Sequence, residues 1–334
     1  MSLGHFILHR IKRQADAKTV LNLKESECDK GGEISELAAE LKRTYLGRIN
    51  REHGRFTSAN GPSALAKALK SHLKGELSFN QFSHQVMTLM KTLIDEKEAE
   101  IDAHALFFIE KSFDNQVFYL FFATDKSAFA IDGKLELKPS HSLDLGPSLF
   151  GVKVDLTEWQ KEKSYAYLSL IAPRGNRPLA NLFYELTDFG NGVDKAEDTR
   201  AFLEGVEAYA DQIAEDQVDS YRSQVVDYCL AQDEQDSGVD IEGLSQAVDN
   251  VDSDEFSQFM VDNYPSSENP VMVDRRSLRR YVKFTGREKD LAISFSSHQL
   301  NNRVLYDSKN DTLSISGLPR ALRSQLLEHI KGRK

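Results

Sequence analysis

The stretch ALFFIEKSFDNQVFYLFFAT, residues 105–124, contains two apolar, aromatic-rich runs separated by the polar pair Asp114-Asn115. Runs of this kind, bounded by turn residues, are typical of neighbouring antiparallel strands. A third run, SAFAIDGKLEL, follows a second turn at Asp125-Lys126. The three runs together predict an antiparallel β-meander.

The residues before and after this meander mix helical and strand patterns. Phe6–Ile11 alternates apolar and polar residues, which predicts a strand, and Thr19–Leu23 is its expected partner. Helical spacing of apolar residues predicts three helices between these strands and the meander: Ile34–Ile49, Pro62–Leu73 and Phe79–Glu98. Two further strands are expected after it: Val152–Asp155 and Tyr165–Ile171.

The second part of the chain has mainly helical periodicity. Helices are predicted at Arg177–Leu186, Lys195–Glu215, Asp216–Asp233, Ile241–Val248, Ser253–Val261 and, at the end of the chain, Pro319–Ile330. Two hairpin-like pairs come before the last helix: Arg280–Thr285 with Leu291–Phe295, and Val304–Tyr306 with Thr312–Ile315.

These patterns predict an α+β fold. We expect an N-terminal mixed domain with an antiparallel sheet at residues 1–172. Residues 173–334 are expected to form a mainly helical acidic region followed by a small basic unit of β-hairpins and a helix.

Composition places the chain among ordinary globular proteins. It has 334 residues, 28% of them charged, and two cysteines, Cys28 and Cys229, which fits a reducing compartment. No apolar run reaches the roughly 18 residues that a bilayer crossing needs, and the N-terminus lacks a signal-peptide pattern. We therefore expect a cytoplasmic protein with no membrane partner.

Charge is distributed unevenly along the chain. The formal net charge is -10, but the segment 185–268 holds 23 acidic residues against three basic ones. Residues 272–334 hold 14 basic residues against six acidic ones. The sequence thus joins an acidic middle to a basic end.

The basic end begins with DRRSLRRYVKFTGREKD, residues 274–290. Arginine binds phosphate well because its planar guanidinium can bond two oxygens at once. If Asp274 caps a helical turn, four arginines fall roughly on one face of that turn. The candidate DNA-binding residues here are Arg275, Arg276, Arg279, Arg280, Lys283, Arg287 and Lys289. The alternative interpretation is a solvated face that pairs with the acidic segment.

A second candidate anion site lies in APRGNRPLANLF, where Arg174 and Arg177 flank a Gly-Asn turn before a predicted helix. A helix N-terminus with nearby arginines attracts anions. The glycine spacing matches neither a P-loop nor a dinucleotide-binding fingerprint. The alternative is a purely structural strand-turn-helix connection.

A weaker pattern concerns Asp125, Glu136 and Lys138, because some metal-dependent nucleases place such residues near a bound magnesium ion. Residue types this common match by chance, and a polar strand edge explains them equally well. The nine histidines show no metal-ligand spacing, and no nucleophile elbow is present. We therefore expect no catalytic residue, metal or cofactor.

Longer stretches resemble a known family. HSLDLGPSLFGVKVDLTEWQ, YLSLIAPRGNRPLANLFYELTDFGNG and DRRSLRRYVKFTG are similar to the bacterial 37-kDa nucleoid-associated protein family. The similarity is strongest between His141 and Asp211 and covers most of the chain. This resemblance assigns no DNA-binding or catalytic residue in the chain.

The resemblance implies association with the bacterial nucleoid, by direct binding to double-stranded DNA, and links to topoisomerases in some members. The leading hypothesis is a non-enzymatic protein that contacts phosphates with little sequence specificity. A homodimer would double those contacts. The alternatives are a factor recruited to the nucleoid through a protein partner and, less favoured, the metal-dependent nuclease.

Overall fold

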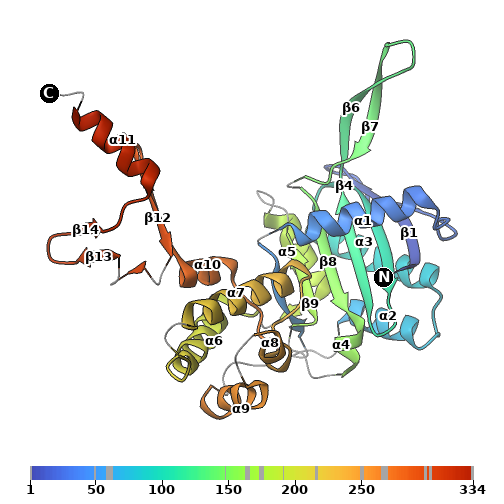
Figure 1. Cartoon of the computed structure of the whole chain (residues 1–334). Helices are drawn as coiled ribbons and strands as arrows, with labels where there is room; N and C mark the ends of the chain where they lie inside the picture. The colour runs from blue at the N-terminus through green and yellow to red at the C-terminus, as the bar shows by residue number, and fades with distance from the viewer. Residues whose placement is uncertain are drawn as a thin grey trace. The chain divides into compact units, whose positions relative to one another are not determined.

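The computed structural model describes residues 2–48, 50–57, 63–146, 148–161, 166–172, 177–190, 192–214, 217–248, 252–264, 270–296, 299–300 and 303–331. Compactness divides the chain into two units, Met1–Asp194 and Lys195–Lys334 (Figure 1). The α+β class is confirmed. The domain boundary expected between residues 172 and 173 stays a prediction.

The first unit is built on an eight-stranded antiparallel sheet. Its strand order is β10-β3-β9-β8-β5-β4-β1-β2. The strands are β1 (Ser2–Arg13), β2 (Val20–Leu23), β3 (Glu52–Phe56), β4 (Ile101–Lys111), β5 (Gln116–Ala123), β8 (Phe150–Asp155), β9 (Leu168–Ile171) and β10 (Phe189–Gly190). The predicted pairing of the first two strands is confirmed by β1 and β2.

Helices cover both faces of this sheet, which explains why β4 is continuously apolar over residues 105–109 and β5 over residues 117–123. Side chains alternate between the two faces of a strand. Phe107 and Phe118 pack on the core side that holds α2 (Ala64–Leu73), α3 (Phe79–Lys97) and α5 (Arg177–Thr187). Phe108 and Phe121 pack on the other side with α1 (Gly32–Leu46). Trp159, on α4 (Leu156–Lys161), is buried in the core that also holds α2, α3 and α5.

The meander prediction is wrong in its third strand. β6 (Asp125–Ile131) does not extend the sheet but pairs with β7 (Leu137–Leu143) as a separate hairpin, which Figure 1 shows standing clear of the sheet. The strand beside β5 is instead β8, which begins 27 residues after β5 ends. The local sequence pattern predicted that β6 is a strand, but it did not predict which strand pairs with β5. Both faces of β8 are buried in the core, whereas the side chains of β6 remain mostly exposed.

Close packing at Gly151 on β8 gives a first test of this core. A Cβ atom there would lie 2.7 Å from a ring atom of Phe121 and 3.1 Å from one of Tyr45. We expect Gly151→Ala to lower the free energy of unfolding by about 1–3 kcal/mol, because the rings have to shift in a filled core. Urea unfolding followed by the fluorescence of Trp159 measures this.

Gly133 provides the control for this substitution, since an added Cβ there meets no atom within 4 Å. Gly133→Ala should leave the unfolding midpoint unchanged. Equal midpoints for wild type and the Gly151 variant would show that the core around Gly151 is looser than described.

The second unit has a helical core followed by two hairpins and a last helix. The helices of the core are α6 (Lys195–Ala210), α7 (Val218–Glu234), α8 (Ile241–Ala247), α9 (Ser253–Asn263) and α10 (Arg275–Val282). They pack around side chains such as Phe202, Val225 and Phe256. The elements that follow are β11 (Lys283–Glu288) with β12 (Leu291–Ser296), β13 (Val304–Asp307) with β14 (Thr312–Ile315), and α11 (Arg320–Lys331). Both predicted hairpins are confirmed, except that Arg280, Tyr281 and Val282 of the first predicted strand belong to α10.

Candidate nucleic-acid interface

Asp274 caps helix α10, which is the condition on which the predicted arginine face depended. Its carboxylate accepts hydrogen bonds from the backbone N–H of Ser277 at 2.8 Å and from the Ser277 hydroxyl at 2.9 Å. The backbone N–H of Asp274 donates to the hydroxyl of Thr199 on α6 at 2.7 Å. These bonds satisfy donors at the start of the helix and fix that start to the helical core.

Leu278 and Tyr281 hold the inner side of α10. Leu278 is fully buried, and the Tyr281 hydroxyl donates to the carboxylate of Glu207 at 2.5 Å. Arg222 also bonds this carboxylate. Burial alone would raise the pKa of Glu207, but the hydrogen bonds from Arg222 and Tyr281 outweigh it and lower that pKa. Glu207 therefore stays charged and keeps α10 attached to α6 and α7.

Arg275 is held by an acid from inside the unit. Its Nε donates to Asp233, a residue of α7 that is only 5% exposed, and Lys195 lies 3.9 Å from the same carboxylate. An arginine in such a pair has less freedom to meet a phosphate. The structure thus gives Arg275 a fixing role in this unit. Asp233 lies 42 residues away, and no local sequence signal pointed to it.

The other three arginines of α10 face solvent. Arg276, Arg279 and Arg280 are exposed and form no ion pair with any described residue. At about 100° per residue they lie on the side of the helix opposite Leu278 and Tyr281. The first turn of α10 contains no acidic residue. The result is an outward-facing triad of guanidinium groups on a fixed helix, which we call the α10 triad.

The β11–β12 hairpin continues from α10 with a more mixed charge. Arg287 and Lys289 are exposed near its turn, where Glu288 and Asp290 are exposed as well. The side chain of Lys283 lies outside the described part of the structure. The positive charge of this region is therefore most concentrated on α10.

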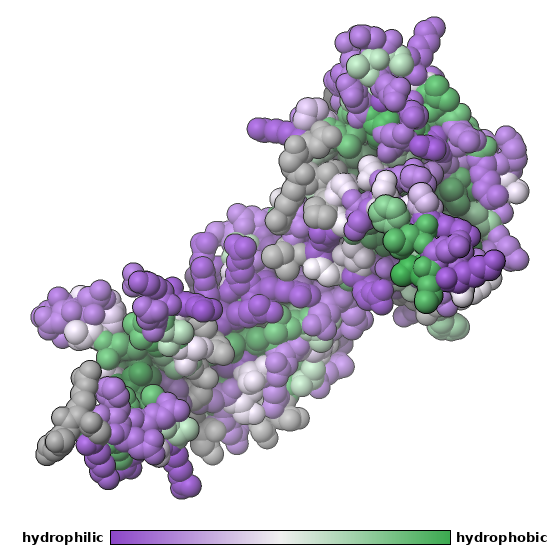
Figure 2. All heavy atoms as spheres, turned by 90° about the horizontal axis from the view of Figure 1, so that it is seen from above, coloured by the Kyte–Doolittle hydropathy of each residue, from purple (hydrophilic) through white to green (hydrophobic). Residues whose placement is uncertain are grey.

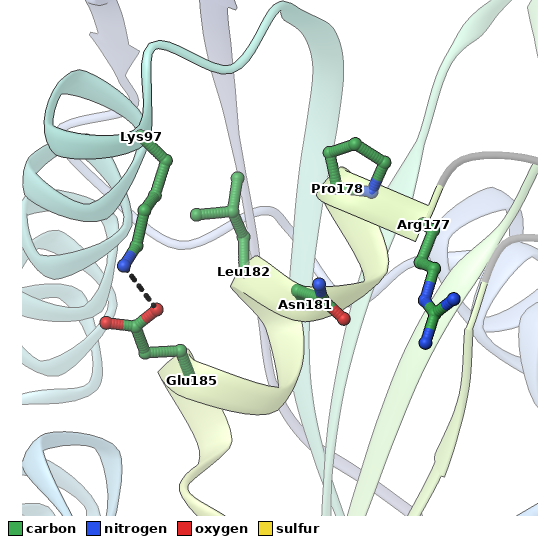
Figure 3. A pocket seen from close by; sticks show the side chains of 6 residues that line it. All are labelled: Lys97, Arg177, Pro178, Asn181, Leu182 and Glu185. Atoms are coloured by element: carbon green, nitrogen blue, oxygen red, sulfur yellow. Dashed lines mark ion pairs between the residues drawn. The ribbon is translucent and has the colours of Figure 1, made fainter.

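The second predicted anion site is described only in part. Arg174 lies outside the described residues. Arg177 is exposed at the first position of α5 and lines a cavity of about 680 Å³, together with Asn181 and an ion pair between Lys97 and Glu185 at 3.4 Å (Figure 3). One free arginine beside an already neutralised pair is a weak anion site.

The residues of the nuclease hypothesis do not converge. Asp125 lies at the base of the β6–β7 hairpin, opposite Leu143, whereas Glu136 lies in its turn, next to the pair Ile131–Leu137. Six strand residues of about 3.3 Å each separate the two carboxylates by roughly 20 Å. Lys138 pairs with Asp132 at 2.8 Å. This spacing is too long for two ligands of one magnesium ion.

The described residues contain neither a group of metal ligands nor a helix fit to span a membrane. Among them, no three His, Cys, Asp or Glu side chains are grouped so that they could hold a metal ion. Within the same residues, no helix combines the length and the apolar character that crossing a membrane requires.

Comparison with known proteins gives one consistent result. Residues 7–323 match the model of the family described as nucleoid-associated protein YejK. A nucleoid-associated protein of Pseudomonas aeruginosa (strain UCBPP-PA14) is 28% identical over 330 residues, which are 98% of this chain and 97% of that protein. A nucleoid-associated protein of Pseudomonas entomophila (strain L48) is 27% identical over an alignment of 338 residues, which covers 100% of this chain and 100% of that protein.

Proposed function

The chain belongs to the family of nucleoid-associated protein YejK, and from this premise we propose that it binds double-stranded DNA directly and without catalysis. The proposed contacts run from exposed arginines to backbone phosphates. Phosphate contacts carry no base information, so binding has little sequence specificity. The α10 triad is the observation that supports this proposal.

The structural context of α10 favours this role. Its start is capped, its inner side is anchored, and Arg275 is engaged by Asp233, so the α10 triad is displayed from a rigid helix. A rigid display lowers the entropy lost when a phosphate is bound. Arg287 and Lys289 would add contacts along the backbone, and Lys283 belongs to the same run of sequence. Arg174 and Arg177 remain a second candidate set.

The acidic segment 185–268 would restrict the part of the chain to which DNA can bind. DNA would be repelled by the acidic side chains of α6 to α9 and attracted by the basic residues of α10 and of the segment that follows it. We propose that this contrast confines the duplex to the basic end of the chain. A homodimer would present two such ends to one duplex.

The charge of the acidic segment also supports a second candidate function. A segment with 23 acids against three bases suits a basic protein partner, and such a partner, a topoisomerase among the candidates, would recruit the chain to the nucleoid. In that case the isolated protein would have little affinity for DNA.

A salt series with wild-type protein separates the two functions. With about five phosphate contacts, affinity for a labelled duplex should fall roughly 500-fold between about 50 and 200 mM salt. Fluorescence anisotropy measures it, and duplexes of unrelated sequence should give equal affinities. No binding at low salt would exclude direct DNA binding by the isolated protein and leave recruitment through a partner.

A further inference from the structure

We propose that the connection between β2 and α1, residues 24–31, opens in acid because His9 then gains a proton and releases it. These residues, KESECDKG, form no helix or strand and are mostly exposed. Hydrophilic side chains predominate in them, as they do on most of the face that Figure 2 shows. Opening the connection therefore exposes little apolar surface, and segments of this kind open locally at low cost.

Three histidines of the first unit contact this connection. Nδ1 of His9, on β1, accepts a hydrogen bond from the backbone N–H of Lys24 at 3.1 Å. Nε2 of His84, on α3, donates to the backbone carbonyl of Lys24 at 2.9 Å. Nδ1 of His5, also on β1, lies 3.0 Å from the carboxylate of Glu27. Both backbone groups of Lys24 are thus bound to histidine rings.

The hydrogen bonds of His9 fix the position of its proton. The Ser83 hydroxyl donates to the backbone carbonyl of Asn80 at 2.8 Å, so its oxygen is left to accept from Nε2 of His9 at 2.9 Å. Nε2 therefore carries the proton of the neutral ring, and Nδ1 is the acceptor for Lys24. A second proton would have to bind Nδ1, where it would face the N–H of Lys24. The protonated ring cannot keep this contact.

The groups that face His9 disfavour a charge on it. Helix α3 contributes Ser83 and His84, whose ring centroid lies 5.2 Å from that of His9. Strand β4 contributes Phe107 at 5.6 Å, and the connection contributes Lys24. None of these described neighbours is an acid. Burial of His9, which is 1% exposed, and the nearby His84 lower the pKa of His9 from 6.5 to about 4.

A fall in pH therefore favours the open form. In the closed form His9 stays neutral down to about pH 4, whereas in the open form water solvates the ring and its pKa returns to about 6.5. Proton uptake by His9 between about pH 7 and pH 5 then raises the opening constant about 20-fold. Below about pH 4 both forms hold the proton and the effect is complete. A proton on His5 strengthens its contact with Glu27 and opposes part of this effect.

The test is amide hydrogen exchange of the full chain, followed by NMR at about pH 7 and pH 5 and corrected for the intrinsic effect of pH. Protection of the Lys24 amide should fall about 10- to 20-fold. At both pH values it should stay below the protection of the Phe107 amide, because β4 lies inside the sheet and exchanges only by larger openings.

Two substitutions assign the effect to His9. In His9→Asn the side-chain oxygen can accept the same N–H but takes up no proton, so the protection of Lys24 should fall by less than about threefold. The control is His141→Asn, which removes an exposed histidine from β7 in the same unit and should keep the full fall.

Three results would overturn the proposal. One is equal protection of Lys24 at both pH values in wild type, because proton uptake would then not be coupled to opening. Another is equal protection of Lys24 and Phe107 at about pH 5, which would mean that only unfolding of the whole unit frees the connection. The third is an unchanged fall in His9→Asn. The first two comparisons use wild type alone, so they decide the question even if the variant does not fold.

Discussion

Replacing Arg276, Arg279 and Arg280 together by Ala is expected to weaken binding to double-stranded DNA on the order of 100-fold at about 0.1 M salt. Each lost phosphate contact takes about 0.9 from the slope of log affinity against log salt, so the slope should become shallower by about 2.7. The three side chains have no ion-pair partner among the described residues, so the fold should be unaffected. Anisotropy titrations across a salt series give both quantities.

The control variant also loses three positive charges, but from the first unit. Lys67, Lys74 and Lys134 are exposed in the first unit, and replacing all three by Ala should leave the slope almost unchanged. Far-UV circular dichroism checks that both variants are folded. If the arginine variant and wild type have the same slope, the α10 triad does not contact phosphate, and Arg174 and Arg177 become the next set to change.

Asp233→Asn is expected to lower the stability of the second unit by about 3 kcal/mol. The asparagine keeps the size of the side chain but removes the charge that Arg275 and Lys195 share in a nearly buried position. The partly buried guanidinium of Arg275 then faces a neutral amide, and losing the acid costs more than the pair itself contributes. Urea unfolding followed by far-UV circular dichroism should show a transition at lower urea.

Trp159 makes this prediction specific to one unit. It is the single tryptophan of the chain and belongs to the first unit, so the transition seen by fluorescence should not move. Asp262→Asn is the matched control, because that exposed acid accepts a hydrogen bond from Gln258 on its own helix. A loss below about 0.5 kcal/mol for Asp233→Asn would mean that the ion pair does not fix α10.

Local sequence patterns determined most of the secondary structure. Except for α4 and the full length of α10, the helices of both units follow from spacing and helix-start residues, and the N-terminal strand pair and the two late hairpins follow from spacing and turn chemistry, which act over a few neighbours. Strand β3, with the sequence EHGRF, gave no such signal. It pairs with β9, more than 100 residues away, and that pairing is set by the common core.

The same division holds for the candidate site. The sequence by itself determined that an acidic chain carries a dense arginine cluster after an Asp274 cap, because charge and capping are properties of neighbouring residues. Only the tertiary structure decided which arginines remain available. Asp233 engages Arg275 across 42 residues, while the α10 triad faces solvent, since burial and long-range ion pairs depend on which elements the fold brings together.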